Sequence, residues 1–373
     1  MVHLIHLLKM DYCKNMKKNI IVQQPADLTV AWAQRVVEQH NADTLVNSVN
    51  IVAVDVGTTT RISIAVDHDG PASIPDRWFV KLPSLSWRAR MITALPRLLH
   101  NEVRFYKEVA HDVPLNMPFC LAAESQFLKG STLVLADVAI DNNVPGIPSD
   151  TLTVPQAAVV IEQLARIHAK FWNNLHHDNQ FRWLAGTVRT LEDALGSALA
   201  VPLMKRGLRY AKKLIPGSLY SPALHYARHR RTAMRFLSDA PHTLIHHDCH
   251  PGNLFWYRDQ SKVGFLDWQL VRIGEGVSDV AYFLSTALCP KMRKTHDAEL
   301  LQLYVETLAK HNITNIDYDQ LMGRYRAHLV YAFEAMIVTL AIGGMMNLSC
   351  NHELVRRTAL AVDDLDAFSA LPI

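Results

Sequence analysis

The 373-residue chain lacks three features: a regular cysteine pattern, a large excess of one charge and an uninterrupted apolar run. Its five cysteines are scattered, odd in number and without metal-ligand spacing, which argues against a disulfide scaffold and favours a reducing, cytoplasmic setting. The formal net charge is only +3 with histidine neutral, so we expect no nucleic-acid or membrane partner. Glu334 interrupts the longest apolar run, residues 329–346, and we expect a buried helix there instead of a membrane span.

Two common phosphate-binding motifs are also missing, Gly-x-Gly-x-x-Gly and Gly-x-x-x-x-Gly-Lys-Ser/Thr. Residues 1–19 show no long apolar region followed by a small-residue cleavage site, so we expect no signal peptide, and Met10 and Met16 are possible alternative starts. The composition, 49% hydrophobic and 20% charged, is that of a soluble globular protein, and the length allows two lobes with cores of their own.

The first third of the chain predicts a sheet with two helices. In one of its strands Ile62, Ile64 and Val66 alternate with more polar residues, which is the period of a half-buried strand. A helix that begins near Asp27 or Thr29 and ends near Gln39 precedes the strands. The expected strands are residues 49–56, 61–67 and 76–82, and a second helix is expected at 98–111. Helical patterns dominate from Thr153 to the C-terminus.

The most informative stretch is His246–Asn253, which reads His-His-Asp-Cys-His-Pro-Gly-Asn and is followed by Asp267-Trp268-Gln269. Two short apolar runs between Asn253 and Asp267 predict a hairpin with a five-residue loop. If this hairpin is symmetric about Gln260, Asn253 faces Asp267, and such opposed residues have Cβ atoms roughly 4.5–5.5 Å apart. An amide oxygen and a carboxylate could then share a hard cation such as Mg²⁺.

Asp248 lies in the loop that leads into this hairpin, where its carboxylate could orient an attacking hydroxyl and accept its proton. Transfer of a phosphoryl group needs little beyond such alignment and charge neutralisation. The stretch therefore predicts phosphoryl transfer from Mg-ATP to a hydroxyl.

These residues carry a resemblance to a known family. His-x-Asp-x-x-x-x-Asn followed by Asp-Trp-Gln resembles the catalytic and metal loops of aminoglycoside phosphotransferase-like kinases, relatives of protein kinases and choline kinases. The wider sequence is most similar to the ecdysteroid-kinase-like branch. The resemblance implies that Asp248 is the catalytic aspartate and that Asn253 and Asp267 bind the metal. Many relatives have glycine where this chain has His247, which puts the effect on rate in doubt.

The resemblance also assigns residues that bind the nucleotide. In the family a strand lysine binds the α- and β-phosphates of ATP and pairs with a helix glutamate, and Lys81 and Glu102 match these positions. Without the resemblance, a solvated lysine and glutamate would be the simpler reading. Residues 133–138, which include Leu135, resemble the hinge strand whose backbone meets adenine.

Two residues resemble parts of the family's scaffold. His168, on the helix that starts near Thr153, resembles a buried helix histidine, and we interpret it as core. Asp279 resembles an aspartate that stabilises the catalytic loop, and a helix N-cap is its alternative role.

The same stretch contains residues that suit two other kinds of chemistry. His246, His247, Asp248 and His250 could bind zinc, although adjacent histidines rarely converge on one ion without helical spacing. A Cys249–His250 nucleophile pair is less plausible still, since such pairs meet in space and not as sequence neighbours.

A second stretch, Asp55–Arg61, reads Asp-Val-Gly-Thr-Thr-Thr-Arg and resembles the phosphate hairpin of actin/hexokinase-type sugar kinases. We find no second phosphate loop to accompany it. In the kinase-like reading, Gly57 lets the turn approach the phosphates, and Thr58 offers an amide and a hydroxyl to them.

We therefore expect an α+β, two-lobed protein-kinase-like fold, with a small antiparallel sheet lobe and a larger, mainly helical lobe. The expected segments are a tail at 1–25, a nucleotide-binding lobe at 26–136, and a catalytic and substrate-binding lobe at 137–373. The expected activity is transfer of the ATP γ-phosphate to a small-molecule hydroxyl, with ATP and Mg²⁺ as cofactors. The alternatives are a sugar kinase that uses Asp55–Arg61 and a non-catalytic nucleotide-binding pseudokinase. The oligomeric state is not indicated.

The acceptor is not named by any motif, but the composition after the motif favours a neutral or anionic, partly apolar hydroxyl compound over a polycationic aminoglycoside. The residues behind this expectation are the cations Arg272, Lys291, Arg293, Lys294, Arg356 and Arg357 and the aromatic residues Trp268, Tyr282, Phe283, Tyr331 and Phe333.

Overall fold

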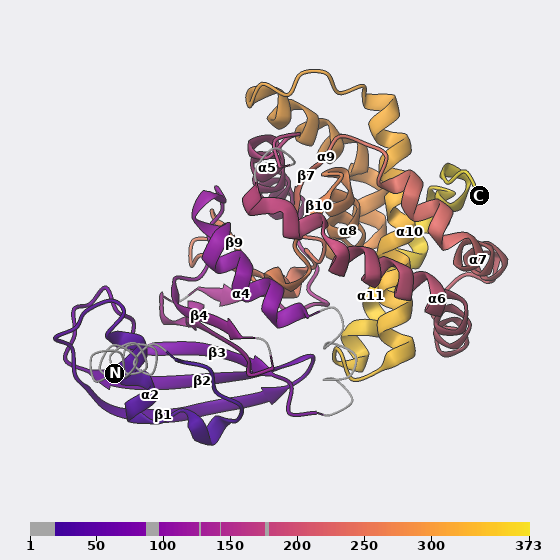
Figure 1. Cartoon of the computed structure of the whole chain (residues 1–373). Coiled ribbons are helices and arrows are strands. Elements are labelled where there is room, and N and C mark those ends of the chain that lie inside the picture. Colours follow the sequence, from indigo (N-terminus) through magenta and orange to yellow (C-terminus); the bar gives the residue numbers. More distant parts are fainter. Residues whose placement is uncertain (1–18, 87–96, 127, 142, 176–178) are drawn as a thin grey trace, which may run out of the picture. The chain divides into compact units, whose positions relative to one another are not determined.

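The computed structural model describes residues 19–86, 97–126, 128–141, 143–175 and 179–373 (Figure 1). The chain divides into two compact units. Unit 1 comprises Met1–Ala110 and Pro118–Ile140, and unit 2 comprises His111–Met117 and Asp141–Ile373. The sequence placed this division after residue 136. Most of the tail expected at 1–25 lies outside the described residues, but Ile20 and Val22 are buried in the core of unit 1.

Unit 1 is built on a five-stranded antiparallel sheet with the strand order β1-β2-β3-β5-β4 (Figure 1). Thr29 caps the first α-helix by accepting a hydrogen bond from the backbone N–H of Trp32, as one of the two expected caps. The elements are η1 (Pro25–Asp27), α2 (Val30–Val37), β1 (Val46–Val56), β2 (Thr59–His68), β3 (Arg77–Pro83), α4 (Leu98–Glu108), β4 (Cys120–Gln126) and β5 (Gly130–Ala136), with η2 (Ala110–Asp112) and η3 (Val138–Asp141) at the unit boundaries.

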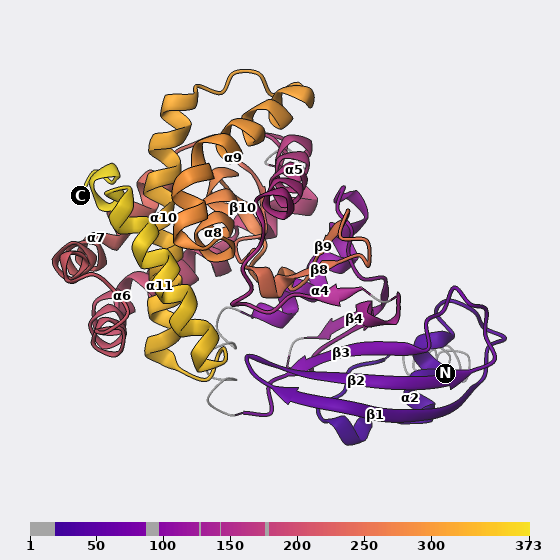
Figure 2. The ribbon, with the colours of Figure 1, turned by 180° about the vertical axis from the view of Figure 1, so that it is seen from behind.

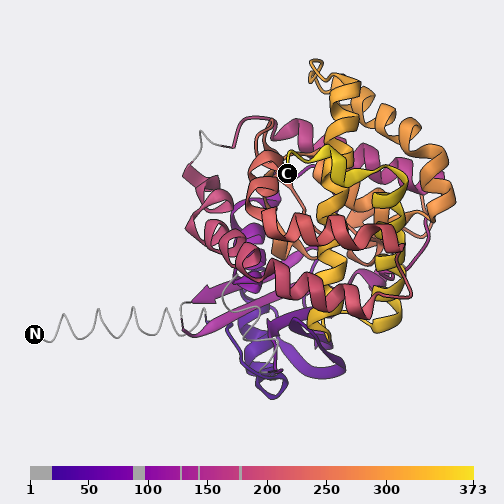
Figure 3. The same cartoon turned by 90° about the vertical axis from the view of Figure 1, so that its right-hand side faces the viewer.

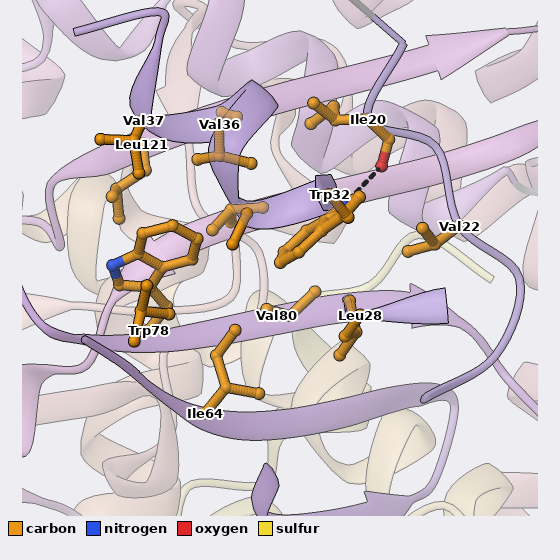
Figure 4. Packing of buried hydrophobic residues seen from close by; sticks show 14 of the residues in the cluster. Ile20, Val22, Leu28, Trp32, Val36, Val37, Ile64, Trp78, Val80 and Leu121 are labelled. Carbon is orange, nitrogen blue, oxygen red and sulfur yellow. Dashed lines mark hydrogen bonds between the residues drawn. The ribbon is translucent and has the colours of Figure 1, made fainter. Parts of the chain in front are cut away.

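The core of unit 1 lies between α2 and the sheet (Figure 4). The ring of Trp32 meets that of Trp78 edge-on with centroids 6.0 Å apart, and its indole N–H donates to the carbonyl of Ile20 over 2.9 Å. The alternation predicted for β2 is confirmed, since Ile62, Ile64 and Val66 are all buried while their neighbours are more exposed. A period of two thus turns one face of the strand toward α2.

Unit 2 is mainly helical and holds two small sheets, β6-β8-β9 and β7-β10. Its first part contains β6 (Val144–Pro145), α5 (Val154–Lys170), η4 (Asn179–Ala185), α6 (Thr187–Tyr210), η5 (Gly217–Leu219), α7 (Tyr220–Leu237), β7 (Thr243–Ile245), η6 (Pro251–Asn253), β8 (Leu254–Trp256) and β9 (Val263–Phe265). Its second part contains η7 (Trp268–Leu270), β10 (Arg272–Gly274), α8 (Val277–Ala287), α9 (Pro290–Lys310), α10 (Tyr318–Ile342), α11 (Leu348–Asp364) and η8 (Ala367–Ala370).

Helix α8 is the centre of unit 2, because every one of its residues is buried. It packs against α5, α9, α10 and α11, which surround it in the views of Figures 1 and 2. An unbroken buried helix of this kind requires apolar residues on all sides, and α8 carries them together with the polar residues that serve the site described below.

Helix α10 is the apolar run that could be mistaken for a membrane span. Among the described residues it passes a test of length and apolarity for spanning a membrane, yet 67% of its most apolar window is buried inside the protein. Its charged residue Glu334 accepts hydrogen bonds from Arg230 (2.6 Å) and Tyr226 (2.7 Å), both on α7. The predicted buried helix is confirmed, and a satisfied ion pair accounts for the charge inside it.

Candidate active site

The loop His246–His250 joins β7 to the β8–β9 hairpin, and Asp279 holds its backbone in place. One carboxylate oxygen of Asp279 accepts the N–H of His246 over 2.7 Å, and the other accepts the N–H of His247 over 2.8 Å. His247 adopts a left-handed backbone conformation (φ 71°), which is uncommon for a residue other than glycine. The two hydrogen bonds stabilise this turn, so Asp279 does what its resemblance implied.

Asp279 is itself supported from the opposite side. His168 of α5 lies with Nε2 at 3.4 Å from the Asp279 carboxylate, and its Nδ1 is 2.9 Å from the Tyr304 hydroxyl on α9. All three side chains are buried, and the chain of polar contacts therefore spans three helices. His168 is part of the scaffold, as its resemblance to a buried helix histidine implied.

Asp248 is held by two side chains that approach its carboxylate separately. The hydroxyl of Tyr282 donates to Oδ1 over 2.7 Å, and the side-chain amide of Asn253 donates to Oδ2 over 3.1 Å and to the backbone carbonyl over 2.8 Å. Burial raises the pKa of Asp248, while His250 and Tyr282 oppose the rise. The side chain keeps 17% of its surface exposed, so it remains accessible to a reactant.

The predicted register of the hairpin is wrong by one residue. Leu254 pairs with Phe265, not with Leu266, and the carbonyl of Asn253 accepts the N–H of Leu266 over 2.8 Å. The ladder extends to Tyr257 and Lys262, so the loop has four residues and closes at Gln260 in the left-handed conformation (φ 54°). A loop with one residue fewer moves every pairing by one position, and Asp267 therefore lies beyond the last pair instead of opposite Asn253.

Asp267 nevertheless lies in the same electrostatic environment as Asp248. It follows β9 in a left-handed conformation (φ 60°), and its charge contributes to the raised pKa of Asp248. The amide nitrogen of Asn253 is engaged by Asp248, which leaves its oxygen as the atom suited to a cation. Neighbouring carboxylates and an amide oxygen form the hard oxygen donor set that Mg²⁺ prefers, so these residues fit a bound magnesium ion.

The zinc alternative is not supported. The imidazole Nε2 of His246 lies 2.8 Å from the carbonyl of Leu266, and the ring of His247 stacks on Tyr331 with centroids 4.4 Å apart. These contacts point the two rings in different directions, and the described residues contain no group of three or more His, Cys, Asp or Glu that could hold a metal.

Cys249 does not have the properties of a nucleophile. Its side chain is fully buried, and burial raises the pKa of its thiol well above the usual value. The thiol donates to the carbonyl of Asp279 over 3.2 Å. A reactive cysteine requires access and a lowered pKa, and Cys249 has neither.

Within unit 1, Lys81 and Glu102 form the expected pair. Nζ of Lys81 on β3 lies 2.8 and 2.9 Å from the two carboxylate oxygens of Glu102 on α4, and both side chains are buried. Burial together with the charge of Glu102 raises the pKa of nearby Cys120 to about 12. The pair is therefore a buried ion pair and not the two solvated side chains of the simpler reading, while its role toward ATP stays a prediction.

The other nucleotide-binding candidates have clear positions. Gly57 and Thr58 form the tip of the β1–β2 hairpin, where the carbonyl of Gly57 accepts the hydroxyl of Ser84 over 2.7 Å. Its φ is not positive, and a Cβ added there would crowd only the end of the Arg61 side chain, at 3.2 Å, so the turn itself does not require glycine. Leu135 is buried in β5 between Phe79 and Cys120, and its contact with a nucleotide base stays a prediction.

A cavity of about 200 Å³ adjoins the loop on the His247 side, and its charges are balanced. Arg272 pairs with Asp193 over 2.8 Å, and Glu275 lies 2.6 Å from both His328 and Arg324. Burial opposes ionisation of Glu275, but these two partners outweigh it and keep its pKa below the usual value. The lining includes Leu184, Met234, Leu237, Ile245, His247 and Tyr331.

Most of the cations and aromatic residues from which the charge of the acceptor was predicted form ion pairs or core contacts instead of lining the cavity. Arg293 is buried between Asp297 and Asp364, Arg356 and Arg357 pair with Glu353, and Trp268, Phe283 and Phe333 are core residues. Within the described part of the chain, only Arg272 and Tyr331 of that set line the cavity. The excess of positive charge that supported an anionic acceptor is therefore not found there.

Tyr282 is the site residue whose role sequence reasoning missed. Asp279 and Tyr282 are three residues apart on α8, and residues with this spacing share one face of a helix. Asp279 was expected to contact the catalytic loop, so this spacing could also have predicted a contact between Tyr282 and that loop.

An antiparallel sheet unit with a buried lysine–glutamate pair, and a helical unit with this aspartate loop, together define a kinase-like phosphotransferase. Residues 65–314 match the family model described as the phosphotransferase enzyme family. The chain belongs to that family, and it is therefore a phosphotransferase. The expected fold class is confirmed, and an antiparallel sheet of this order excludes the actin/hexokinase alternative.

Solved structures show the same fold at low identity. An ethanolamine kinase from Plasmodium vivax is 11% identical with a TM-score of 0.52, and the match covers 91% of this chain and 90% of that chain. A choline kinase from Cryptosporidium parvum is 12% identical with a TM-score of 0.50, covering 89% and 93%. A search of curated protein sequences finds no significant match.

Proposed function

We propose that this protein transfers the γ-phosphoryl group of ATP to the hydroxyl of a small molecule. The observation that carries the proposal is the Asp248 carboxylate, oriented by Tyr282 and Asn253 and near enough to Asp267 for its charge to raise the pKa of Asp248. A carboxylate that is held on both oxygens and still partly exposed is suited to position a hydroxyl and accept its proton. The acceptor oxygen forms a bond to the γ-phosphorus as the bond from the γ-phosphorus to the bridging oxygen breaks, and ADP leaves.

In this proposal Asn253 and Asp267 hold magnesium, and Lys81, fixed by Glu102, binds the nucleotide phosphates. The metal neutralises charge that develops on the phosphates when it is bound. Gly57 and Thr58 approach the same phosphates, and the backbone near Leu135 meets the base. A cytoplasmic location, where ATP is abundant, is part of the proposal.

The balanced cavity beside His247 supports an acceptor without a large charge of either sign. His247 precedes Asp248 in the chain, and Tyr331 of the cavity wall is adjacent to Tyr282, which binds Asp248. An acceptor in this cavity would meet apolar side chains together with paired charges, which suits a neutral, partly apolar alcohol.

The test is Mg-ATP turnover against a broad panel of alcohols. We expect Asp248→Asn to lower kcat by about a thousandfold or more with nucleotide binding retained, and Asp267→Ala to raise the magnesium concentration required. The exposed loop residue Asp259, on the same hairpin, provides the matched control as Asp259→Asn. Turnover like that of the wild type in both site variants would refute the mechanism.

A non-catalytic nucleotide-binding protein would require Lys81 and Asp267 but not Asp248, and membership of a phosphotransferase family argues against it. Measured Mg-ATP affinity of the wild type without phosphotransfer to any alcohol of the panel would favour it.

A further inference from the structure

The charge of this chain is concentrated in one segment. Residues 194–238 contain nine Lys and Arg and no Asp or Glu, a net charge of +9. The rest of the chain has 29 Lys and Arg against 35 Asp and Glu, a net −6. The formal total of +3 therefore conceals a strongly basic stretch, the part of the α6–α7 helical hairpin that follows Asp193, on an otherwise acidic protein.

Nearly all of these cations face solvent. Arg230 is the buried exception and pairs with Glu334. No ion pair joins the other eight to a carboxylate within the part of the chain that the structure describes, although Arg206 lies over the ring of Tyr210. The eight exposed residues are Lys205, Arg206, Arg209, Lys212, Lys213, Arg228, Arg231 and Arg235.

Five of the eight form a continuous basic segment at the end of α6 and the turn after it, namely Lys205, Arg206, Arg209, Lys212 and Lys213. Figure 3 looks onto the side of unit 2 that carries α6 and α7. The spacing of 205, 206 and 209 places these side chains on one face of the helix. Like charges at this density repel one another when no carboxylate neutralises them. A polyanionic partner would reduce this electrostatic repulsion.

The same face of α6 is apolar along its first half. Leu191, Leu195 and Leu199 recur at four-residue spacing and are 50%, 39% and 43% exposed. These three residues, with Ala194 and Ala198 exposed beside them, form a leucine stripe that continues by helical spacing into the basic segment. Exposed leucines aligned on one helix face indicate contact with something apolar.

We propose that this face of α6 docks on an anionic lipid surface, with the leucine stripe in the acyl boundary and the basic segment on the headgroups. A lipid surface is the partner that accommodates both halves, since leucines enter the interface while lysines and arginines bind anionic headgroups. A nucleic acid would use the cations together with aromatic side chains for stacking and would leave the leucines in water.

The experiment measures binding of the full chain to vesicles by flotation. The vesicles contain phosphatidylcholine alone or phosphatidylcholine with phosphatidylserine, at low and at high NaCl. We expect binding to the phosphatidylserine vesicles only, with a strong decrease at high salt. Each cation near such a surface strengthens binding about fivefold, so losing three of them in Lys205→Glu/Arg209→Glu/Lys212→Glu should weaken binding at least about 100-fold.

Two further variants separate the contributions. Leu191→Gln/Leu195→Gln/Leu199→Gln should weaken binding about tenfold or more while the salt dependence persists, because glutamine keeps the helix but not the apolar contact. Lys262→Glu/Lys291→Glu/Lys310→Glu changes the net charge by the same amount at exposed lysines outside α6 and α7. This control should bind like the wild type. Circular dichroism of each variant confirms that it is folded.

The proposal fails if the wild type does not float with phosphatidylserine vesicles, or if the basic-segment variant floats as well as the lysine control. Binding to single-stranded RNA or DNA in place of vesicles, unaffected by the leucine variant, would assign the surface to nucleic acid and also overturn it. If the basic-segment variant does not fold, the salt dependence of the wild type and the leucine variant still decide the question.

Discussion

At the scale of single residues, Asp248 depends on partners that lie far from it in the sequence. Tyr282 contacts one carboxylate oxygen, Asn253 the other, and Asp279 fixes the backbone two residues before it. A carboxylate with both oxygens engaged keeps one orientation, and such preorganisation lowers the cost of reaching a reactive geometry.

Tyr282→Phe should lower kcat about tenfold and lower the stability by only about 1–2 kcal/mol. The substitution removes the hydrogen bond to Asp248 and keeps the buried ring, so the carboxylate gains freedom while packing persists. Steady-state turnover of Mg-ATP and a thermal melt measure the two effects. Tyr257→Phe, in the hairpin, is the control, and equal kcat values for the two variants would contradict a positioning role for Tyr282.

His100 makes the stability depend on pH. Burial and the charges of Arg97 and Arg104 lower its pKa from 6.5 to about 4, and Nδ1 lies 2.8 Å from the hydroxyl of Ser125. Because the folded pKa lies below the unfolded one, the stability is fully present above pH 6.5 and is lost as the pH falls toward 4.

The loss should reach about 1–2 kcal/mol, less than the roughly 3 kcal/mol of a fully shielded group, since His100 is only partly buried. Urea unfolding at pH 7 and pH 5 measures it. His100→Asn should reduce the difference between the two pH values, whereas the exposed His111→Asn should not. An unchanged difference in His100→Asn would show that other groups carry the pH dependence.

At the scale of elements, the β8–β9 hairpin and the β3–α4 pair carry the candidate ligands. The hairpin depends on close packing inside it: a Cβ atom added at Gly264 would overlap the ring of Phe255, the residue it pairs with. The lysine–glutamate pair depends on both partners, because removal of either leaves a buried charge.

Gly264→Ala should destabilise the protein by about 1–3 kcal/mol, because the ring of Phe255 must move and the hairpin shifts with it. Gly323→Ala is the matched control. Gly323 lies inside α10 with open space around the added Cβ, so alanine should stabilise by up to about 1 kcal/mol. Thermal melts compare the two, and a tolerated Gly264→Ala would show that the hairpin is looser than its packing indicates.

Lys81→Met should destabilise the protein by about 3–5 kcal/mol, because it leaves the carboxylate of Glu102 buried without its cation. The double variant Lys81→Met/Glu102→Leu removes both charges and should recover most of the lost stability. Its affinity for Mg-ATP should stay low, since the proposed phosphate ligand is absent. Chemical unfolding and nucleotide titration separate these outcomes, and full nucleotide affinity in the double variant would rule out the proposed role of Lys81.

At the scale of the whole molecule, the separation of charge matters more than its sum. The basic stretch 194–238, with a charge of +9, and the remainder, with −6, should attract one another between molecules, whereas a uniform charge of +3 would repel. Salt reduces the Debye length from roughly 30 Å at 0.01 M to about 10 Å at 0.1 M, so the attraction is limited to dilute salt.

Light scattering should therefore give a negative second virial coefficient at low ionic strength, which rises as NaCl is added. The variant Lys205→Glu/Arg209→Glu/Lys212→Glu should show a weaker salt dependence. A coefficient that is positive at low salt and falls with NaCl would show that the molecule behaves as uniformly charged.

The sequence by itself determined the family, the fold class and the approximate bounds of most elements. Local patterns sufficed for these, because the alternation in β2, the cap at Thr29 and the spacing of Asp248, Asn253 and Asp267 depend on near neighbours. Lys81 and Glu102 were paired only through the family resemblance, and the structure brings them together.

Only the tertiary structure decided the hairpin register, the contacts of Asp248 and the position of the charges. One loop residue more or fewer shifts the register of the strands. The composition of the loop does not show at which residue strand pairing stops and the loop begins. Tyr282 meets Asp248 across 34 positions, and Arg293 is buried between carboxylates although it looked available from the sequence. The residues of the leucine stripe and the basic segment can be read from the sequence, but whether they face solvent depends on how α6 packs in the fold.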